Sequence, residues 1–326
     1  MLTCQFCGET GTTEDDLQFQ LDKYGRGFWC ESCDGYTYLS ETVRKHRFTL
    51  ILEDKTQVLT RKVTSLKKFR KQLSPLRYPG GKQKLIDYLY THLQDKNTFR
   101  LVSPFTGGGS FELAMLDAGV VKELHLNDLD FGIYSLWWTI LHAPYELLDK
   151  LHTYTPTHSD YFYSQILIKE DFQGATVFDA AWATLVVNRL AYSGIAKANP
   201  LGGKNGSKKA LLSRWNPATL EKRINNIASL SDRIRISNID ANELIEEAYW
   251  DDSNTIFIDP PYVEKGKQLY NHFYTKHDHA RLAMLLDSLH HGMPGADIIV
   301  TYDHNEWLYR QYDFPETHII GSQYSI

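Results

Sequence analysis

Short apolar runs alternate with helical patterns along most of the chain after residue 73, and this alternation restricts the fold more than any other feature. The strand-like runs lie at residues 99–103, 123–126, 234–236, 255–258 and 298–302. The helical patterns lie at residues 82–93, 110–118, 217–230 and 279–290. We expect Asn216 and Asp278 to cap the last two helices. The pattern predicts an α/β fold with a Rossmann-like doubly wound sheet, in which ligands bind at the carboxyl ends of the strands.

The chain is long enough for two domains, because it has 326 residues of which 42% are hydrophobic. Residues 48–52 and 58–59 surround a short charged turn and are expected to form a hairpin that completes a small amino-terminal module over residues 1–60. A basic linker follows at residues 61–73, and the larger domain spans residues 74–326.

Composition excludes several classes of protein. The sequence contains no stretch of about 18 apolar residues and no basic-then-apolar start, so we expect no membrane partner, no signal peptide and a cytoplasmic location. The formal net charge of −5 argues against indiscriminate polyanion binding. Any contact with nucleic acid must therefore come from local basic patches.

All four cysteines fall in the first 33 residues as two CxxC pairs, formed by Cys4, Cys7, Cys30 and Cys33. Four thiolates in two tight pairs are typical of a tetrahedral structural Zn²⁺ site, and they predict a zinc ribbon. Two disulfides are the alternative, which a cytoplasmic location disfavours. No histidine or glutamate joins the set, so the site is expected to be structural rather than catalytic.

Asp259-Pro260-Pro261-Tyr262 follows the apolar run at residues 255–258 directly. A carboxylate and a proline carbonyl at a strand end can accept both N–H hydrogens of a planar amine, and an aromatic ring can stack on the base that carries it. The alternative is a purely structural role, in which the strand ends in a proline turn and the motif has no catalytic function. The motif predicts a site that holds and activates an amino group.

Three more motifs follow predicted strands. The glycine-rich segment 104–110 opens a helix, and its glycines let the backbone approach a ligand closely. It is not a dinucleotide fingerprint, because Glu112 stands where the third glycine would be, and an NAD-dependent oxidoreductase is therefore remote. Asp128 lies in an acidic turn suited to the two hydroxyls of a ribose. Asp240 could accept from an adenine amine or could serve only as a helix cap.

Taken in order, residues 76–82 (LRYPGGK), 104–111 (PFTGGGSF), 127–128 (ND) and 259–262 (DPPY) resemble the Dam-type (D12 class) DNA adenine N6-methyltransferases over about residues 75–326. Residues 188–194 (NRLAYSG) are similar to a further stretch of that family. The resemblance implies a methyltransferase sheet with a mainly helical target-recognition insertion at about 145–235, to which the zinc ribbon is an addition. It also implies S-adenosylmethionine as the methyl donor. The residues expected to bind the donor are Tyr78, Gly81, Lys82, Phe105, Gly107, Gly109, Asp128 and Asp240.

The resemblance implies that an adenine flipped out of double-stranded DNA is methylated at N6. Asp259 and the Pro260 carbonyl would accept the N6 hydrogens while Tyr262 stacks on the base. Phosphate contacts are expected from Lys197, Lys204, Lys208, Lys209 and Arg214. The aromatic residues Trp137, Trp138, Trp182 and Tyr192 are expected in the core.

Two other functions remain open at this point: cytosine-N4 methylation, and an inactive zinc-ribbon DNA-binding protein on a methyltransferase fold. The expected setting is a bacterial or phage-infected cell, with a cognate restriction or defence system as a conceivable partner.

Overall fold

The computed structural model describes residues 47–54, 67–78, 80–93, 98–263 and 273–321 in full. In the first 46 residues it describes the backbone of five short strands. These are β1 (Leu2–Thr3), β2 (Thr10–Gly11), β3 (Gln18–Asp22), β4 (Gly25–Cys30) and β5 (Gly35–Tyr38). β1 pairs with β2, and β3, β4 and β5 form an antiparallel sheet in that order.

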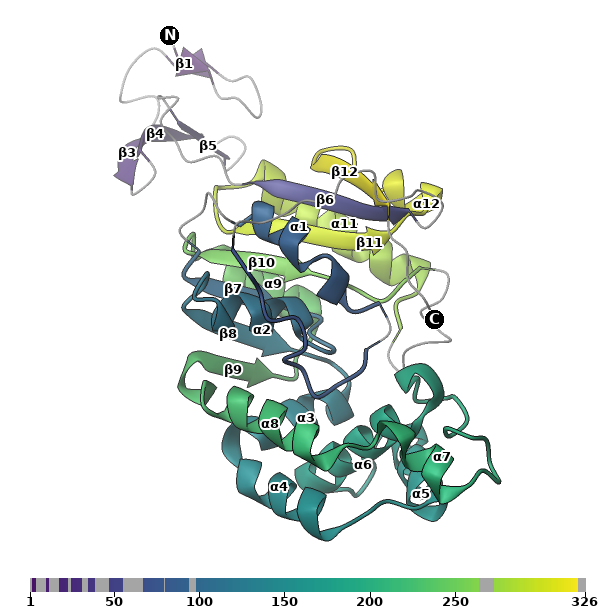
Figure 1. Cartoon of the computed structure of the whole chain (residues 1–326). Coiled ribbons are helices and arrows are strands. Elements are labelled where there is room, and N and C mark those ends of the chain that lie inside the picture. Colours follow the sequence, from purple (N-terminus) through teal and green to yellow (C-terminus); the bar gives the residue numbers. More distant parts are fainter. Residues whose placement is uncertain are drawn as a thin grey trace.

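A seven-stranded sheet forms the centre of the molecule (Figure 1). Its strands are β6 (Phe48–Asp54), β7 (Arg100–Ser103), β8 (Glu123–Asn127), β9 (Ile234–Ser237), β10 (Asn254–Ile258), β11 (Asp297–Asp303) and β12 (Glu316–Gly321). The order across the sheet is β12-β6-β11-β10-β7-β8-β9, and every neighbouring pair is parallel. The five strands predicted from the sequence are all present, with ends that move by one residue at most.

Helices cover both faces of this sheet, as the alternating pattern predicts. On one face lie the short helix η1 (Lys82–Lys84), α1 (Ile86–Thr91) and α2 (Ser110–Asp117). On the other lie α9 (Ala241–Tyr249) and α11 (Lys276–His291), while α12 (Glu306–Tyr309) precedes the last strand. Side chains alternate along the strands accordingly. In β6, Ile51 packs in the core cluster that includes α1 and α2, whereas Leu50 and Leu52 pack in the cluster that includes α9 and α11.

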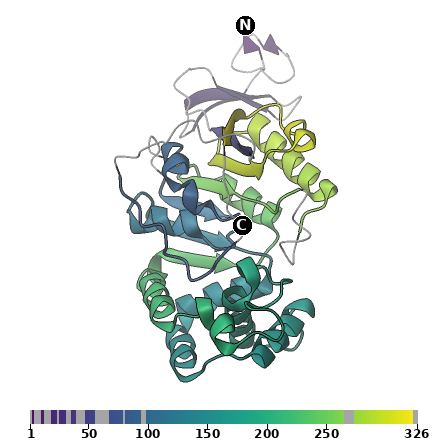
Figure 2. The same ribbon diagram turned by 45° about the vertical axis from the view of Figure 1, so that its right-hand side comes forward.

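A helical region gathers beyond β9, at the bottom of Figures 1 and 2. It contains α3 (Phe131–His142), α4 (Pro144–Thr153), α5 (His158–Lys169), α6 (Val177–Leu190), η2 (Tyr192–Gly194), α7 (Lys208–Leu211), η3 (Leu212–Arg214), α8 (Pro217–Ala228) and η4 (Ser231–Arg233). α6 lies at its centre and packs against both α3 and α5. Within the described ranges, no helix combines the length and the apolar character that crossing a lipid bilayer requires.

The expected hairpin at residues 48–59 is wrong in its first half. Phe48–Asp54 forms β6, which lies inside the large sheet between β11 and β12. The residues from Phe48 to Glu53 are all buried, so the run is continuous rather than alternating, as is usual for an interior parallel strand. Residues 58–59, the expected second half, lie outside the described residues.

The two expected helix caps differ in outcome. Asn216 caps α8 and accepts a hydrogen bond from the backbone N–H of Thr219. Asp278 does not cap α11, because Thr275 holds that position and Asp278 stands three residues later, where it completes a capping box. The helix therefore begins three residues earlier than the sequence pattern indicates.

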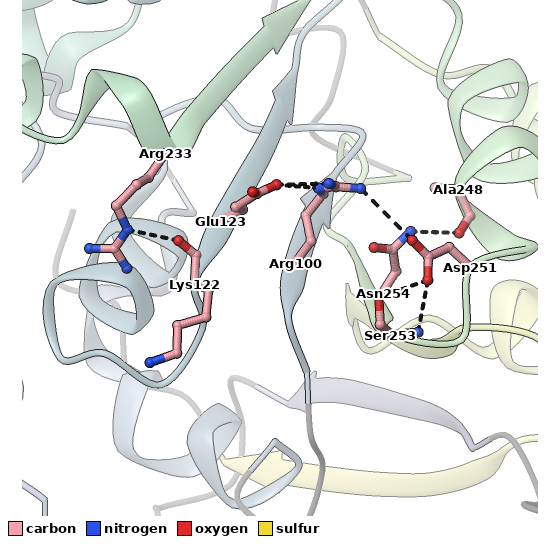
Figure 3. Close-up of polar contacts among 8 residues, drawn as sticks. All are labelled: Arg100, Lys122, Glu123, Arg233, Ala248, Asp251, Ser253 and Asn254. Carbon is pink, nitrogen blue, oxygen red and sulfur yellow. Dashed lines mark hydrogen bonds and ion pairs between the residues drawn. The ribbon is translucent and has the colours of Figure 1, made fainter.

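Charged side chains tie together the amino ends of the central strands (Figure 3). Arg100 on β7 forms an ion pair of 2.7 Å with Glu123 on β8 through Nη2. Its Nη1 lies 4.0 Å from a carboxylate oxygen of Asp251, which precedes β10. Arg233 donates to the carbonyl of Lys122 across the β8–β9 end. This edge is stabilised by polar contacts and lies opposite the strand ends that carry the sequence motifs.

Candidate active site

A cavity of about 360 Å³ opens at the carboxyl ends of the strands. Its walls come from the segments that follow β7, β8, β9 and β10, together with the segment before α1. β7 and β10 are neighbours from which the chain continues in opposite directions across the sheet, so the cavity lies at the topological switch point. All eight residues expected to bind the donor line it, namely Tyr78, Gly81, Lys82, Phe105, Gly107, Gly109, Asp128 and Asp240.

The glycine-rich loop is shaped by close packing. Gly107 and Gly109 have positive φ angles of 48° and 57°. A Cβ atom on Gly107 would lie 2.6 Å from the Tyr78 ring, and one on Gly109 would lie 2.8 Å from the Trp137 ring. The Trp137 indole N–H donates to the carbonyl of Gly107 at 3.1 Å. Glycine is therefore required at both positions, because side chains there would fill the space that the two aromatic rings occupy.

Two carboxyl groups in the wall are buried deeply enough to change their ionisation. Asp128 accepts from the backbone N–H groups of Gly107 and Asp130, and burial, followed by the charge of Asp130, raises its pKa to about 7. Burial also raises the pKa of Glu112 to about 7, although the Ser103 hydroxyl donates to it at 2.6 Å. Both groups thus titrate near neutral pH rather than near pH 4.

Asp240 has both features that the sequence left as alternatives. It caps α9 by accepting from the backbone N–H of Asn242 at 2.9 Å, and it also lines the cavity. The side-chain oxygen of Asn242, which lines the same wall, is buried without a hydrogen-bond partner in the described structure. This end of the cavity therefore offers polar groups to a bound ligand.

Asp259 extends from the end of β10 with its two carboxylate oxygens in different surroundings. Its Oδ1 lies 2.7 Å from Lys82 Nζ and accepts from the Thr301 hydroxyl at 2.8 Å. Its Oδ2 has no partner among the described residues, and the side chain is 20% exposed at the cavity. Burial raises the pKa of Asp259, while the Lys82 ammonium opposes that shift. One oxygen is fixed and the other is available to a donor in the cavity.

Glu53 and Thr301 are functional candidates that sequence reasoning missed. Lys82 Nζ donates to the carbonyl of Gly80 at 3.0 Å and lies 2.7 Å from Asp259 Oδ1 and 3.0 Å from Glu53 Oε1. The contact with Glu53 Oε1 is an ion pair without hydrogen-bond geometry. Glu53 follows an apolar run directly, as Asp259 does. That pattern could have identified it, had the run been assigned to the large sheet.

The remaining residues of the 259–262 motif are placed differently from one another. Pro261 lines the cavity, whereas Pro260 is buried. Tyr262 is 5% exposed, does not line the cavity, and holds its hydroxyl against Gly80. Lys82 Nζ lies 5.6 Å from the centre of the Tyr262 ring. Asp259 and Pro261 therefore line the cavity, whereas Tyr262 is buried outside it.

The basic residues expected to bind DNA lie between α6 and α8. Lys197, Lys204, Lys208 and Lys209 are exposed, and Arg214 on η3 is half-buried. Tyr192, expected in the core, is 57% exposed on the same connection, whereas Trp137 is buried as expected. The prediction for Tyr192 is therefore wrong.

Four arginines distant in sequence form a cluster that the sequence did not reveal: Arg77, Arg189, Arg214 and Arg223. Arg189 is 7% exposed and donates to the carbonyl of Arg214. Burial, followed by the charges of the other three, lowers the pKa of Arg189 to about 10. In the described part of the chain none of the four has an acidic partner, and Arg189 Nε and Arg214 Nη1 are buried without an acceptor. The arginine cluster is an unneutralised positive site.

The predicted zinc ligands cannot be placed. Cys4, Cys7 and Cys33 lie outside the described residues. Cys30 is the last residue of β4 and pairs with Gly35 of β5, but its side chain is not described. The zinc site stays a prediction.

The fold and the cavity together define a class: an α/β enzyme that binds a nucleoside-like ligand at the switch point of a parallel sheet. Comparison with known proteins narrows the class. Residues 78–326 match the D12 class N6 adenine-specific DNA methyltransferase family, and the chain belongs to that family. It is also similar to the type II methyltransferase M.MjaIII of Methanocaldococcus jannaschii, with 21% identity over 221 residues that cover 62% of this chain and 73% of the relative. The protein is an S-adenosylmethionine-dependent N6-adenine DNA methyltransferase.

Proposed function

We propose that the cavity holds S-adenosylmethionine and that Asp259 activates N6 of an adenine flipped out of double-stranded DNA. The observation that carries this proposal is the position of Asp259 in the wall of the cavity formed with the glycine loop, with Lys82 and Thr301 contacting Oδ1 and no described residue contacting Oδ2. An acceptor at that place can bind an exocyclic amine beside a bound methyl donor. The family assignment favours adenine over cytosine as the base.

The residues that line the cavity fit the donor. Acidic side chains outnumber basic ones in its wall, which suits a ligand that carries a sulfonium and an ammonium group better than it suits a pyrophosphate. Asp128 would hold the ribose hydroxyls, and Asp240 with the unpartnered Asn242 oxygen would meet the adenine ring. Tyr78, Gly81 and Lys82, which also line the cavity, would contact the methionine portion. When bound, the donor supplies a methyl group on a positively charged sulfur.

Asp259 contributes position and charge to the reaction. The amine lone pair of adenine is conjugated with the ring and is a poor nucleophile. If Asp259 Oδ2 accepts one N6 hydrogen and the carbonyl of Pro260, which does not line the cavity in the protein without DNA, accepts the other, the lone pair is localised on nitrogen and directed at the methyl group. The contacts of Oδ1 with Lys82 and Thr301 hold the carboxylate in one orientation, so little reorganisation is needed.

Tyr262 would stack on the flipped base, which requires its ring to leave the contact with Gly80. We therefore infer that DNA binding moves this ring into the cavity.

The arginine cluster is the best candidate for the DNA backbone site, and it extends the expected lysine set. Four guanidinium groups without acidic partners in the described structure attract phosphate strongly, because each carries a positive charge and several N–H donors. Arg77 directly precedes Tyr78 in the cavity wall, and its backbone exchanges two hydrogen bonds of 2.8 Å with Asn188. A phosphate held there would lie next to the cavity that receives the base.

The amino-terminal part of the chain is proposed to form a zinc ribbon ahead of β6, with the four cysteines as ligands. The basic linker at residues 61–73 and the domain from residue 74 onward, with a helical target-recognition part at about 145–235, complete the proposed organisation. A type II relative supports a restriction-modification setting for this protein.

The base and the reaction are tested together by nucleoside analysis. DNA incubated with the purified protein and labelled S-adenosylmethionine is digested, and the labelled nucleoside is identified. N6-methyladenine is the expected product. N4-methylcytosine would assign the wrong base, and no labelled nucleoside on DNA of mixed sequence would contradict the proposed function.

A further inference from the structure

We propose that Glu53, on a strand that precedes the residues matched by the family, is a positioning residue of the active site that acts on Asp259 through Lys82. The matched residues begin at 78, whereas Glu53 is the sixth residue of β6. The inference rests on the proposed role of Asp259 and adds a charged partner to it.

The sheet register explains why Glu53 reaches the site. β6 and β11 pair with Ile51 opposite Thr301 and Glu53 opposite Asp303, and Asp259 follows Ile258, whose partner on β11 is Val300. Glu53, Thr301 and Asp259 therefore lie near the carboxyl ends of three adjacent strands. The residues two positions earlier on each strand pack in the core cluster on the α1 side: Ile51, Ile299 and Phe257. Because strand side chains alternate, the three polar groups face that side too.

Lys82 meets them from the same side. It lies on η1, directly before α1, which covers the face toward which Ile51 points (Figure 1). Its ammonium lies 3.0 Å from Glu53 and 2.7 Å from Asp259, and the side chains of Lys82 and Glu53 are 2% and 1% exposed. The backbone of Glu53 is held on both sides, since its neighbours are β11 and β12. A buried ammonium between two carboxylates has a fixed position that neither carboxylate alone would impose.

The charge of Glu53 has a defined effect on Asp259. Two carboxylates share one ammonium, so the group carries a net negative charge beside the cavity. Glu53 weakens the hold of Lys82 on Asp259 and raises the pKa of that carboxyl group, whereas Lys82 lowers it. Asp259 is thereby a stronger hydrogen-bond acceptor for the amine than it would be in a simple pair with lysine. Glu53 does not line the cavity.

The test compares variants that change one charge at a time. Glu53→Gln removes the negative charge with little change in shape, and Lys82→Gln removes the positive one. The readouts are the single-turnover methylation rate against pH, the affinity for S-adenosylmethionine, and the carboxyl titration of ¹³C-labelled aspartate in the free protein, with Asp259→Asn to assign the resonance. Ile51→Val is the matched control, because it alters packing on the same strand and face without changing charge.

Glu53→Gln is expected to slow methyl transfer about tenfold or more while donor affinity stays within about threefold. The acid limb of its pH profile and the Asp259 titration should move to lower pH, whereas in Lys82→Gln the titration should move to higher pH. In Ile51→Val, the acid limb of the pH profile and the Asp259 titration should match those of the parent. An Asp259 titration in Glu53→Gln that matches the parent would overturn the inference.

A double variant keeps the inference testable if Glu53→Gln does not fold. Glu53→Gln/Lys82→Gln leaves no unpaired buried charge between these two positions, and its Asp259 titration should lie below that of Lys82→Gln. Identical titrations would show that Glu53 has no influence. If the parent itself fails to methylate DNA, the proposed function fails, but the titration of the free protein still decides whether Glu53 acts on Asp259.

Discussion

Gly107→Ala should damage the donor site through a single added methyl group. The new Cβ would lie 2.6 Å from one carbon of the Tyr78 ring and 2.7 Å from another, and the φ angle of +48° is unfavourable for any residue with a side chain. Tyr78 must then move from its position in the cavity wall. Gly119→Ala is the matched control, because Gly119 has a similar φ of +65° but no atom within 4 Å of its Cβ position.

Comparing the two variants separates the cost of the left-handed backbone from the cost of the steric clash with Tyr78. A left-handed backbone costs a residue other than glycine about 1–2 kcal/mol, and both variants carry that cost. Overpacking adds about 1–3 kcal/mol, and only Gly107→Ala carries it. The difference in unfolding free energy should therefore be about 1–3 kcal/mol, or about 2–4 °C in melting temperature for each kcal/mol.

Urea unfolding and calorimetric titration with S-adenosylmethionine measure the two consequences. Gly119→Ala should bind the donor as the parent does, and Gly107→Ala should bind it more weakly. Equal stability losses in the two variants, or unchanged donor affinity in Gly107→Ala, would refute the packing argument.

Three other predictions concern ionisation, DNA binding and the sheet. Burial raises the pKa of Glu112 from 4.5 to about 7, so the folded parent loses stability as pH rises through that interval. Glu112→Gln should therefore gain roughly 2 kcal/mol relative to the parent between pH 5 and pH 8 in urea unfolding, and equal pH slopes would contradict this. Arg223→Gln should reduce the slope of log Kd for DNA against log salt by about 0.9, measured by fluorescence anisotropy, whereas Arg100→Gln at the opposite sheet edge should not. Deletion of residues 1–46 should preserve the circular dichroism spectrum of the sheet domain, but deletion of residues 1–54 should abolish it. The four buried apolar side chains of β6 contribute about 6–12 kcal/mol, which is comparable with the whole stability of a domain.

The sequence was sufficient for the features that depend on local pattern. Strand and helix alternation predicted the parallel sheet, and acidic or glycine-rich segments directly after apolar runs predicted which residues line the cavity. This worked because the carboxyl ends of parallel strands meet at one edge of a sheet, so that order along the chain is enough to bring the motifs together.

Features that depend on distant contacts were missed or wrong. The run at residues 48–52 looked the same whether it paired locally or entered the large sheet, and only the tertiary structure places β6 between β11 and β12. Glu53 was missed with it. The arginine cluster joins residues from four separate segments, and no spacing in the sequence reveals that they meet. Asp278 resembled a helix cap because a capping box contains two residues suited to that position.

The most direct test of the central claim is the methylation rate of Asp259→Ala against its affinity for the donor. The account predicts that donor binding stays within about threefold of the parent, because the cavity wall is otherwise unchanged, while single-turnover methylation of adenine in DNA is lost. A methylation rate within about threefold of the parent would contradict the role of Asp259 as the group that activates the amine.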